Sequence, residues 1–189
     1  MKTLILNGSP RKSGVTAQIL GHFSDLLQTR SEIENIYLYA EEIKPCRGCL
    51  KCRPDKTCIL PHDAAHDIAF KINESDLLIF GFPTYWGNMP GPLKNLFDRC
   101  VPVFEYIEGF QIKKMQKGKK AIIVTSSSAP FPYNQLPSQS RGAIRSIKTI
   151  LNAGGIETIR VVNIANSKNF DQKRASVFEK INHFINWKF

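Results

Sequence analysis

The sequence has no uninterrupted apolar run of about 18 residues, the length at which a transmembrane helix is first considered. After the single cation Lys2, the N-terminus also lacks the apolar segment of a secretory signal peptide. These two absences argue against a membrane-spanning or exported protein. We therefore expect a soluble cytoplasmic protein that has no membrane partner.

Acidic residues are scarce relative to basic ones, with 16 Asp and Glu against 26 Lys and Arg, so the formal net charge is +10. Such an excess of basic residues is compatible with binding to nucleic acid or to an anionic nucleotide, and it also occurs in proteins without any such partner. The densest basic segment, residues 113–120, lacks the interleaved aromatic residues of a groove that binds single strands. We expect a solvated loop there and no nucleic-acid partner.

With 189 residues and 42% hydrophobic content, the chain can bury a substantial core, and no linker or repeat divides it. We expect one domain over residues 1–189. Five apolar runs predict strands, at residues 3–6, 33–38, 77–82, 121–125 and 159–164. Apolar residues at three- and four-residue spacing predict helices at residues 15–29, 63–75, 92–100, 141–152 and 171–186.

The runs at residues 77–80 and 121–124 are continuously apolar, which is typical of strands that are covered on both faces. Strands and helices alternate along the chain, and right-handed crossovers then place helices on both faces of a sheet. The sequence therefore predicts an α/β fold with a three-layer, doubly wound, five-stranded parallel sheet. Ligands of such sheets bind beyond the carboxyl ends of the strands.

The clearest motif is NGSPRKSGVT at residues 7–16, between the first predicted strand and the first predicted helix. It combines two glycines, three hydroxyl groups and two cations next to the unpaired N–H groups of a helix start. A plain turn with Ser13 or Thr16 as the helix cap would explain one hydroxyl group, but not the other two and both cations. We therefore predict an anion-binding loop.

Two other phosphate-related activities are disfavoured, because this loop lacks the residues that they need. A Walker loop ends in Gly-Lys-Ser/Thr, whereas this loop ends in Ser-Gly-Val-Thr, which disfavours nucleoside triphosphate hydrolysis. A low-molecular-weight phosphatase would need a cysteine nucleophile in the loop, and residues 7–14 contain no cysteine.

Two further loops follow predicted strands at the same edge of the sheet. Residues 81–91 contain the adjacent aromatics Tyr85 and Trp86 with free backbone groups, which suits a flat heterocycle, although packing over the next helix is the alternative. In the segment after the fourth strand, Ser126 or Ser127 could donate to a ring carbonyl, and a flexible surface loop explains that segment equally well.

Together, the GSPRKSGVT loop, the PTYWGNMPGPLKN segment with the following Asp98-Arg99, and the five-strand layout resemble the flavodoxin-like NAD(P)H-dependent FMN reductases. The resemblance implies the strand order 2-1-3-4-5 and FMN at the carboxyl edge. It implies that the phosphate lies on Ser9, Arg11, Ser13, Gly14, Val15 and Thr16. It also implies that the isoalloxazine ring lies on Pro83, Thr84, Tyr85, Trp86, Gly87, Asn88 and Met89, and that a homodimer or homotetramer helps to wall the site.

Four of the five cysteines, Cys46, Cys49, Cys52 and Cys58, lie close together in the sequence. Structural disulfides are not expected in a chain without an export signal. The spacing is similar to the compact motif of iron-sulfur flavoproteins, which implies a [4Fe-4S] cluster, whereas other relatives have such segments without metal. Zinc is a further alternative. His62 and His66 have the spacing of a divalent metal pair, but without a further ligand we interpret them as an exposed helix start.

We therefore predict an FMN-dependent oxidoreductase that moves hydride from NADH or NADPH to FMN and then to a small-molecule acceptor such as a quinone or a flavin. Since the flavin carries the chemistry, no side chain is predicted to act as a catalytic acid or base, and no metal is assigned. The alternative is an iron-sulfur flavoprotein that carries electrons between partners. A nucleic-acid-binding module without flavin is a third possibility.

Overall fold

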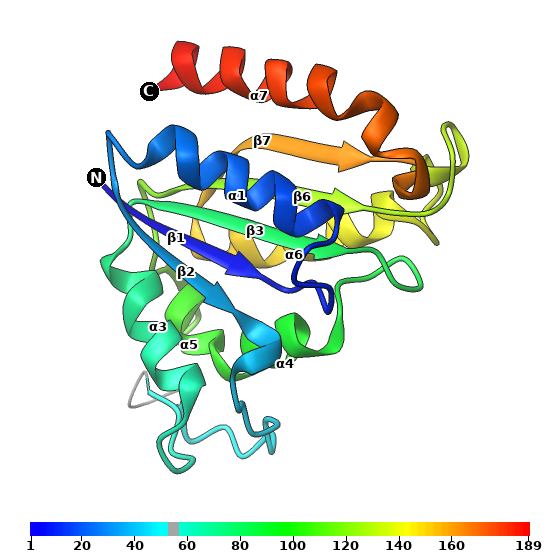
Figure 1. Cartoon of the computed structure of the whole chain (residues 1–189). Helices are drawn as coiled ribbons and strands as arrows, with labels where there is room; N and C mark the ends of the chain where they lie inside the picture. Colours follow the sequence, from blue (N-terminus) through cyan, green and yellow to red (C-terminus); the bar gives the residue numbers. More distant parts are fainter. Residues whose placement is uncertain (53–56) are drawn as a thin grey trace.

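Five parallel strands form the central sheet in the order β2-β1-β3-β6-β7 (Figure 1). The computed structural model describes residues 1–52 and 57–189. The strands are β1 (Lys2–Asn7), β2 (Glu32–Tyr37), β3 (Leu77–Pro83), β6 (Lys120–Ser126) and β7 (Glu157–Ile164). Counted within this sheet, the order is 2-1-3-4-5, which confirms the predicted topology.

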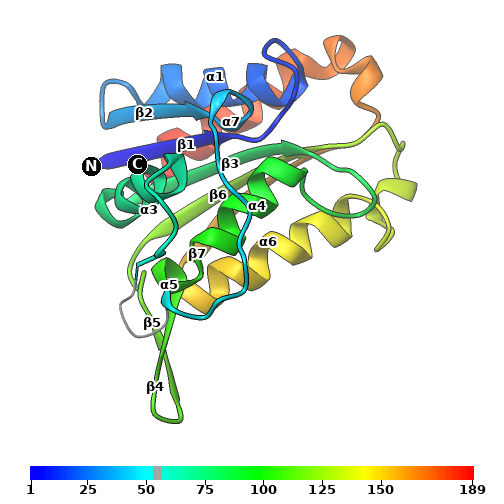
Figure 2. The same cartoon turned by 90° about the horizontal axis from the view of Figure 1, so that it is seen from below.

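Helices cover both faces of the sheet, as Figures 1 and 2 show. One face packs against α1 (Val15–Leu27) and α7 (Arg174–Lys188), and the other against α3 (Ala64–Glu74), α4 (Gly91–Arg99), α5 (Val101–Phe104) and α6 (Ser140–Gly154). Short 3-10 turns are η1 (Leu38–Ala40), η2 (Tyr133–Gln135), η3 (Ser167–Asn169) and η4 (Asp171–Lys173). The buried side chains form two apolar clusters, one on each side of the sheet. The predicted three-layer architecture is confirmed.

The helices and strands begin and end close to their predicted positions. The largest difference is at the C-terminal helix, which was predicted from Asp171 and begins at Arg174 because residues 171–173 form η4. β3 is buried along nearly its whole length, and β6 likewise, as their continuous apolar runs predict. The apolar runs and the apolar residues at helical spacing therefore located these elements well.

The prediction of a solvated loop over residues 113–120 is only partly correct. Residues 105–114 form a two-stranded antiparallel hairpin of β4 (Glu105–Glu108) and β5 (Gln111–Lys114), which projects from the body of the protein in Figure 2. Lys113 forms an ion pair with Glu108 across this hairpin. Such short strands have too little apolar alternation to stand out in the sequence.

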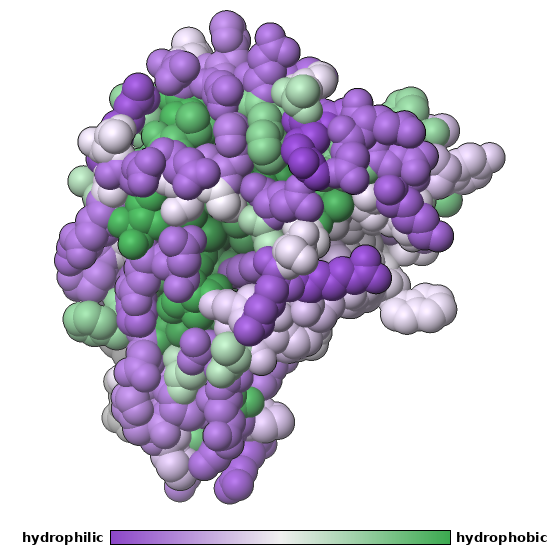
Figure 3. All heavy atoms as spheres, in the orientation of Figure 1, coloured by the Kyte–Doolittle hydropathy of each residue, from purple (hydrophilic) through white to green (hydrophobic). Residues whose placement is uncertain are grey.

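β2 lies at one edge of the sheet and is only partly covered by its neighbours. Its residues are mostly exposed or half-buried, whereas Ile36 is buried in the apolar cluster on the face that α3 and α4 cover. In Figure 3, apolar surface shows between polar side chains in the region of α1, β2 and α3. The opposite edge strand, β7, is partly covered by α6 and α7. The interior strands β1, β3 and β6 therefore carry the core.

Candidate functional site

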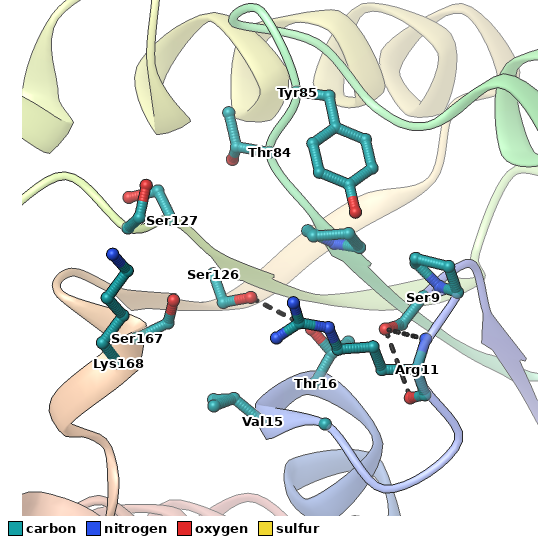
Figure 4. Close-up of a pocket in the computed structure, with 14 residues that line it drawn as sticks. Ser9, Arg11, Val15, Thr16, Thr84, Tyr85, Ser126, Ser127, Ser167 and Lys168 are labelled. Carbon is teal, nitrogen blue, oxygen red and sulfur yellow. Dashed lines mark hydrogen bonds between the residues drawn. The ribbon is translucent and has the colours of Figure 1, made fainter.

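A pocket of about 280 Å³ opens at the carboxyl edge of the sheet, where loops after four strands meet (Figure 4). Parallel strands all end at the same edge, so segments far apart in sequence converge there. The lining residues are Ser9, Pro10, Arg11, Gly14, Val15, Thr16, Pro83, Thr84, Tyr85, Ser126, Ser127, Ser128, Ser167 and Lys168. The pocket is therefore built from the three predicted loops and from a fourth segment after β7.

The first loop is held against the sheet by backbone contacts. The Gly8 N–H donates to the Gly81 carbonyl at 2.7 Å, and the Ser9 N–H donates to Asn7 Oδ1 at 3.0 Å. A side chain on Gly8 would meet Leu93 at 3.3 Å, so the close approach favours glycine. Gly14 then forms the N-cap of α1 without any side-chain cap, and the residues that open the helix line the pocket. Their N–H groups carry the partial positive charge of a helix start.

Hydroxyl groups form the buried floor of the pocket. Thr16 Oγ1 lies 3.2 Å from Ser126 Oγ, a contact that joins α1 to the end of β6. Thr84 Oγ1 lies 3.0 Å from Thr125 Oγ1, which joins the ends of β3 and β6. Ser127 Oγ is also buried, yet it has no hydrogen-bond partner among the described residues. The site thus contains one buried hydroxyl group that is free to bind a ligand.

The charge of the pocket is positive. Arg11 and Lys168 are its two ionisable cations, and none of the described lining residues is acidic. Figure 4 shows that the Arg11 side chain lies beside Thr16 and Ser126, while Lys168 approaches from the opposite side, next to Ser167. Two cations, several hydroxyl groups and a helix start favour a ligand with an anionic group.

A tight turn over residues 85–88 forms the rim of the pocket. Tyr85 and Asn88 exchange backbone hydrogen bonds of 3.0 and 2.9 Å, and both central residues have positive φ, +52° at Trp86 and +70° at Gly87. A left-handed conformation is rare for a bulky residue such as tryptophan. The Trp86 side chain is also 98% exposed. The turn therefore presents a large aromatic ring to solvent at the edge of the site.

A second segment holds this turn from behind. A Cβ atom on Gly87 would lie 2.7 Å from the Pro137 carbonyl oxygen, and one on Gly142 would lie 2.0 Å from the same oxygen and 2.5 Å from the Gly87 oxygen. Gly142 is in the first turn of α6. The two glycines therefore allow the aromatic turn to lie directly against the start of α6.

The structure separates the predicted site residues into two groups. Those that line the pocket are Ser9, Arg11, Gly14, Val15, Thr16, Pro83, Thr84, Tyr85, Ser126 and Ser127. Those that do not line it are Ser13, Trp86, Gly87, Asn88 and Met89. Of the second group, Ser13 is exposed, and Met89 is buried in the apolar cluster beneath the sheet.

Sequence reasoning missed Ser167 and Lys168, which line the pocket from the segment after β7. The Ser167 N–H donates to the Ser127 carbonyl at 2.9 Å, which joins the two loops. The position of these two residues after the fifth predicted strand was the one sequence signal that could have placed them at the pocket. Residues that follow the fifth parallel strand must also come to the carboxyl edge.

The cysteine segment lies apart from the pocket, between η1 and α3. Cys46 and Cys49 are exposed, while Cys52 and Cys58 are half-buried. Burial raises the pKa of the Cys52 thiol, and the neighbouring Cys58, Cys46 and Cys49 raise it further. In the described part of the chain, however, no three His, Cys, Asp or Glu side chains are gathered closely enough to hold a metal ion. The fifth cysteine, Cys100, is buried in the core.

The interpretation of His62 and His66 as an exposed helix start needs correction. The N-cap of α3 is Asp63, whose side chain accepts from the Ala65 N–H at 3.1 Å. His66 is mostly buried, and its Nε2 lies 3.0 Å from the Cys58 carbonyl oxygen. His62 is exposed, and its ring stacks on the ring of His66. His66 therefore has a structural role that the spacing alone did not reveal.

Asp63 also forms a buried ion pair with Arg99 of α4. Arg99 Nη1 lies 2.7 Å from Asp63 Oδ2 and Nη2 lies 3.1 Å from Oδ1, with both side chains almost fully buried. Burial by itself would raise the pKa of Asp63. Hydrogen bonds from Arg99 and from the Lys44 N–H, together with the guanidinium charge, outweigh it and lower the pKa to about 2.

With this fold and this site, the chain belongs to the flavodoxin-like fold family, whose model matches residues 1–185. Among curated relatives, it is 35% identical over 102 residues to an iron-sulfur flavoprotein of Methanosarcina thermophila, covering 53% of each chain. It is 32% identical over 123 residues to an iron-sulfur flavoprotein of Methanocaldococcus jannaschii, covering 65% of this chain and 62% of the relative. The chain thus spans less than two thirds of the length of either relative.

A solved structure supports the same fold. An FMN-dependent NADH-azoreductase from Bacillus anthracis, in complex with FMN, superposes with a TM-score of 0.77 over 98% of this chain and 97% of that chain. The sequence identity is only 15%, so the likeness concerns the fold. Separately, no helix among the described residues combines the length and the apolar character that crossing a membrane requires.

Proposed function

We propose that the pocket at the carboxyl edge binds FMN. The observation that carries this proposal is the convergence in one pocket of the Arg11 and Lys168 cations, the start of α1 and the Ser127 hydroxyl group, which has no partner in the described part of the chain. The phosphate would lie on the first loop, where Ser9, Arg11 and Thr16 meet the opening of α1. The ring would lie toward Thr84 and Tyr85, with Ser127 donating to a ring oxygen or nitrogen.

We further propose that the protein is an NAD(P)H-dependent oxidoreductase. FMN, when bound, supplies hydride transfer between a reduced nicotinamide and an acceptor such as a quinone or a flavin. The protein's own residues would bind and orient the partners and stabilise negative charge on the ring through N–H and O–H donors. The azoreductase with a similar fold, described as FMN-dependent and NADH-using, supports this class of reaction.

We also propose that the chain acts as a single domain. We further propose that a second copy of the chain covers the exposed Trp86.

The test uses Arg11→Ala, with Lys12→Ala as the matched control because Lys12 does not line the pocket. A charge-assisted hydrogen bond contributes about 1.5–3 kcal/mol, so Arg11→Ala should weaken FMN binding by roughly 10- to 100-fold. Riboflavin, which lacks the phosphate, should bind both variants as it binds the wild type. Fluorescence titration gives the affinities, and the rate of hydride transfer in fully loaded protein should change much less. Equal FMN affinity in Arg11→Ala and wild type would refute the phosphate assignment.

A second candidate function is that of an iron-sulfur flavoprotein that passes electrons between partners. Two curated relatives carry that description, and the four thiols Cys46, Cys49, Cys52 and Cys58 belong to one segment between η1 and α3 of this chain. Four thiolates are the donor set of a [4Fe-4S] cluster, so the residue types suit the group, but among the described residues no three of these side chains are gathered closely enough to hold one. Iron and labile sulfide assays on anaerobically purified protein, together with its visible spectrum, test this proposal. A flavin spectrum without iron would favour the reductase alone.

A further inference from the structure

We propose that Lys168 faces the polar edge of the flavin ring beside Ser127 and stabilises the negative charge that the ring gains on reduction. By polar edge we mean the side of the ring that carries its carbonyl oxygens. This inference rests on the proposed binding of FMN and goes beyond it, because it gives the two cations of the pocket separate roles. Lys168 lies in η3, which follows the last strand of the central sheet.

Backbone hydrogen bonds join the segment that contains Lys168 to the loop that contains Ser127. The Ser167 N–H donates to the Ser127 carbonyl at 2.9 Å. The Asn166 N–H donates to the Ala129 carbonyl, also at 2.9 Å. The backbone of Lys168 is therefore held close to that of Ser127.

The segment is also anchored on its other side, and this anchoring leaves the Lys168 ammonium group unused. Phe170 is 2% exposed and packs in the apolar cluster that α1 and α7 cover. The Lys173 ammonium group donates to the Ala165 carbonyl, so this nearby cation is already bound within the segment. Lys168, by contrast, is exposed and forms no hydrogen bond or ion pair with the described residues. Its ammonium group is thus available to a ligand in the pocket.

The two cations of the pocket lie on opposite sides of it (Figure 4). Arg11 belongs to the first loop, where the phosphate is proposed to lie, and its side chain lies beside Thr16 and Ser126. Lys168 approaches from the other side, and its ammonium group points toward Ser127. A phosphate on the first loop therefore has Arg11 beside it and leaves Lys168 for another part of the cofactor.

The Ser127 hydroxyl group indicates which part of the cofactor Lys168 faces. This group is buried, and it has no hydrogen-bond partner in the described part of the chain. It therefore requires a polar ligand atom, which the proposed binding of FMN supplies from a ring oxygen or nitrogen. Because Lys168 points toward the same place, its ammonium group would lie near that atom. A hydroxyl donor beside a cation suits an atom on which negative charge gathers.

Hydride transfer places such a charge on the ring. A hydride from a reduced nicotinamide brings two electrons and one proton, so the neutral oxidised ring becomes an anion while the nicotinamide becomes oxidised. A cation at the polar edge therefore interacts more strongly with the reduced ring than with the oxidised ring. Lys168 should thus raise the reduction potential of bound FMN, which favours its reduction by the nicotinamide.

The test compares Lys168→Met with Lys180→Met, a matched control that removes one cation from an exposed position of α7 outside the pocket. Fluorescence titration gives the affinity for oxidised FMN, and equilibration with a redox dye gives the midpoint potential. Solvent weakens the interaction of an exposed cation, so we expect Lys168→Met to weaken the binding of reduced FMN roughly 10-fold more than that of oxidised FMN. By linkage, a tenfold ratio lowers the midpoint potential of this two-electron couple by about 30 mV. Lys168→Arg keeps the charge and should keep most of the wild-type potential, and Lys180→Met should match wild type.

An unchanged midpoint potential in Lys168→Met would overturn the inference and leave the proposed binding of FMN intact. Weaker binding of both redox states by the same factor would also overturn it, because a cation that contacts only the phosphate acts equally on both states. Equal shifts in Lys168→Met and Lys180→Met would assign the effect to net charge and overturn it as well. A wild-type protein that binds no FMN would overturn the proposed function together with the inference.

Discussion

At the scale of single residues, the pocket shows a conflict between stability and binding. Ser127 is 5% exposed, its Oγ has no partner among the described residues, and its backbone is fixed because its N–H donates to the Ile164 carbonyl at 2.9 Å. A buried polar group without a partner costs free energy in the ligand-free protein. Such a cost is expected where a ligand supplies the missing hydrogen bond.

Replacing Ser127 with alanine should therefore have opposite effects on folding and on binding. The free energy of unfolding of the FMN-free protein should rise by about 1 kcal/mol, because the unsatisfied hydroxyl group is removed. FMN affinity should fall by roughly tenfold, because the ring loses one donor. Urea unfolding and fluorescence titration measure the two quantities. Ser138→Ala, at an exposed position that does not line the pocket, is the control. A simultaneous loss of stability and affinity in Ser127→Ala would contradict this account.

Ionisation of Asp63 should make the free energy of unfolding depend on pH in a definite direction. Its folded-state pKa of about 2 lies below the ordinary value of 3.8, so its stabilising effect is complete above pH 4 to 5 and is lost as the pH falls toward 2. The full effect is about 2 kcal/mol, and roughly half of it is lost by pH 3. The difference in unfolding free energy between wild type and Asp63→Asn should therefore narrow by about 1 kcal/mol between pH 7 and pH 3. Urea unfolding at both pH values measures it, and a constant difference would show that Asp63 is not stabilised as the carboxylate.

At the scale of elements, helix starts and glycine contacts decide where the loops lie. α1 begins at the phosphate loop, α4 begins just after the aromatic turn, and α6 begins directly behind that turn. The close approach of Gly87, Pro137 and Gly142 joins the aromatic turn to the start of α6. The shape of the rim therefore depends on backbone packing between elements rather than on any one side chain.

A pair of glycine substitutions tests this dependence. Gly142→Ala places a Cβ atom 2.0 Å from the Pro137 oxygen, so the aromatic turn and α6 must move apart. We expect a loss of about 1–3 kcal/mol of unfolding free energy, as for overpacking elsewhere, together with weaker FMN binding. Gly21→Ala, within α1 and with nothing within 4 Å of its Cβ, should instead gain about 0.5–1 kcal/mol. Thermal unfolding of both variants checks the signs, and equal behaviour would contradict the packing argument.

At the scale of the whole molecule, the excess of basic residues acts on an anionic cofactor before any contact forms. The formal net charge is +10, and the pocket itself carries two cations. Attraction between the protein and a phosphate raises the association rate, and salt screens it over a Debye length of about 10 Å at 0.1 M. The net charge therefore affects the association kinetics and the kind of partner, but it does not determine the fold.

We therefore expect FMN association to slow severalfold as salt rises from low to high concentration. Riboflavin has no phosphate, so its association rate should change little, which makes it the internal control. Stopped-flow quenching of flavin fluorescence measures both rates. If both flavins respond equally to salt, the phosphate is not the group that the protein attracts.

The sequence by itself determined the sheet and its ligand-binding edge. Continuous apolar runs at residues 77–80 and 121–124 fixed interior strands, and alternation of strands with amphipathic helices fixed the layers. The glycines, hydroxyls and cations of residues 7–16 indicated an anion loop, and most of that loop lines the pocket. These features are local, since periodicity and turn chemistry involve residues near one another in the chain.

Only the tertiary structure decided which distant residues meet. Lys168 reaches the pocket after β7, Met89 turns inward to the core, and Arg99 joins Lys44 to Cys58 across a bend that no motif marks. Trp86 was predicted to lie under the flavin ring, yet its side chain points to solvent. Side-chain direction and contacts between distant segments depend on how the elements pack in three dimensions, and local sequence patterns carry little information about that packing.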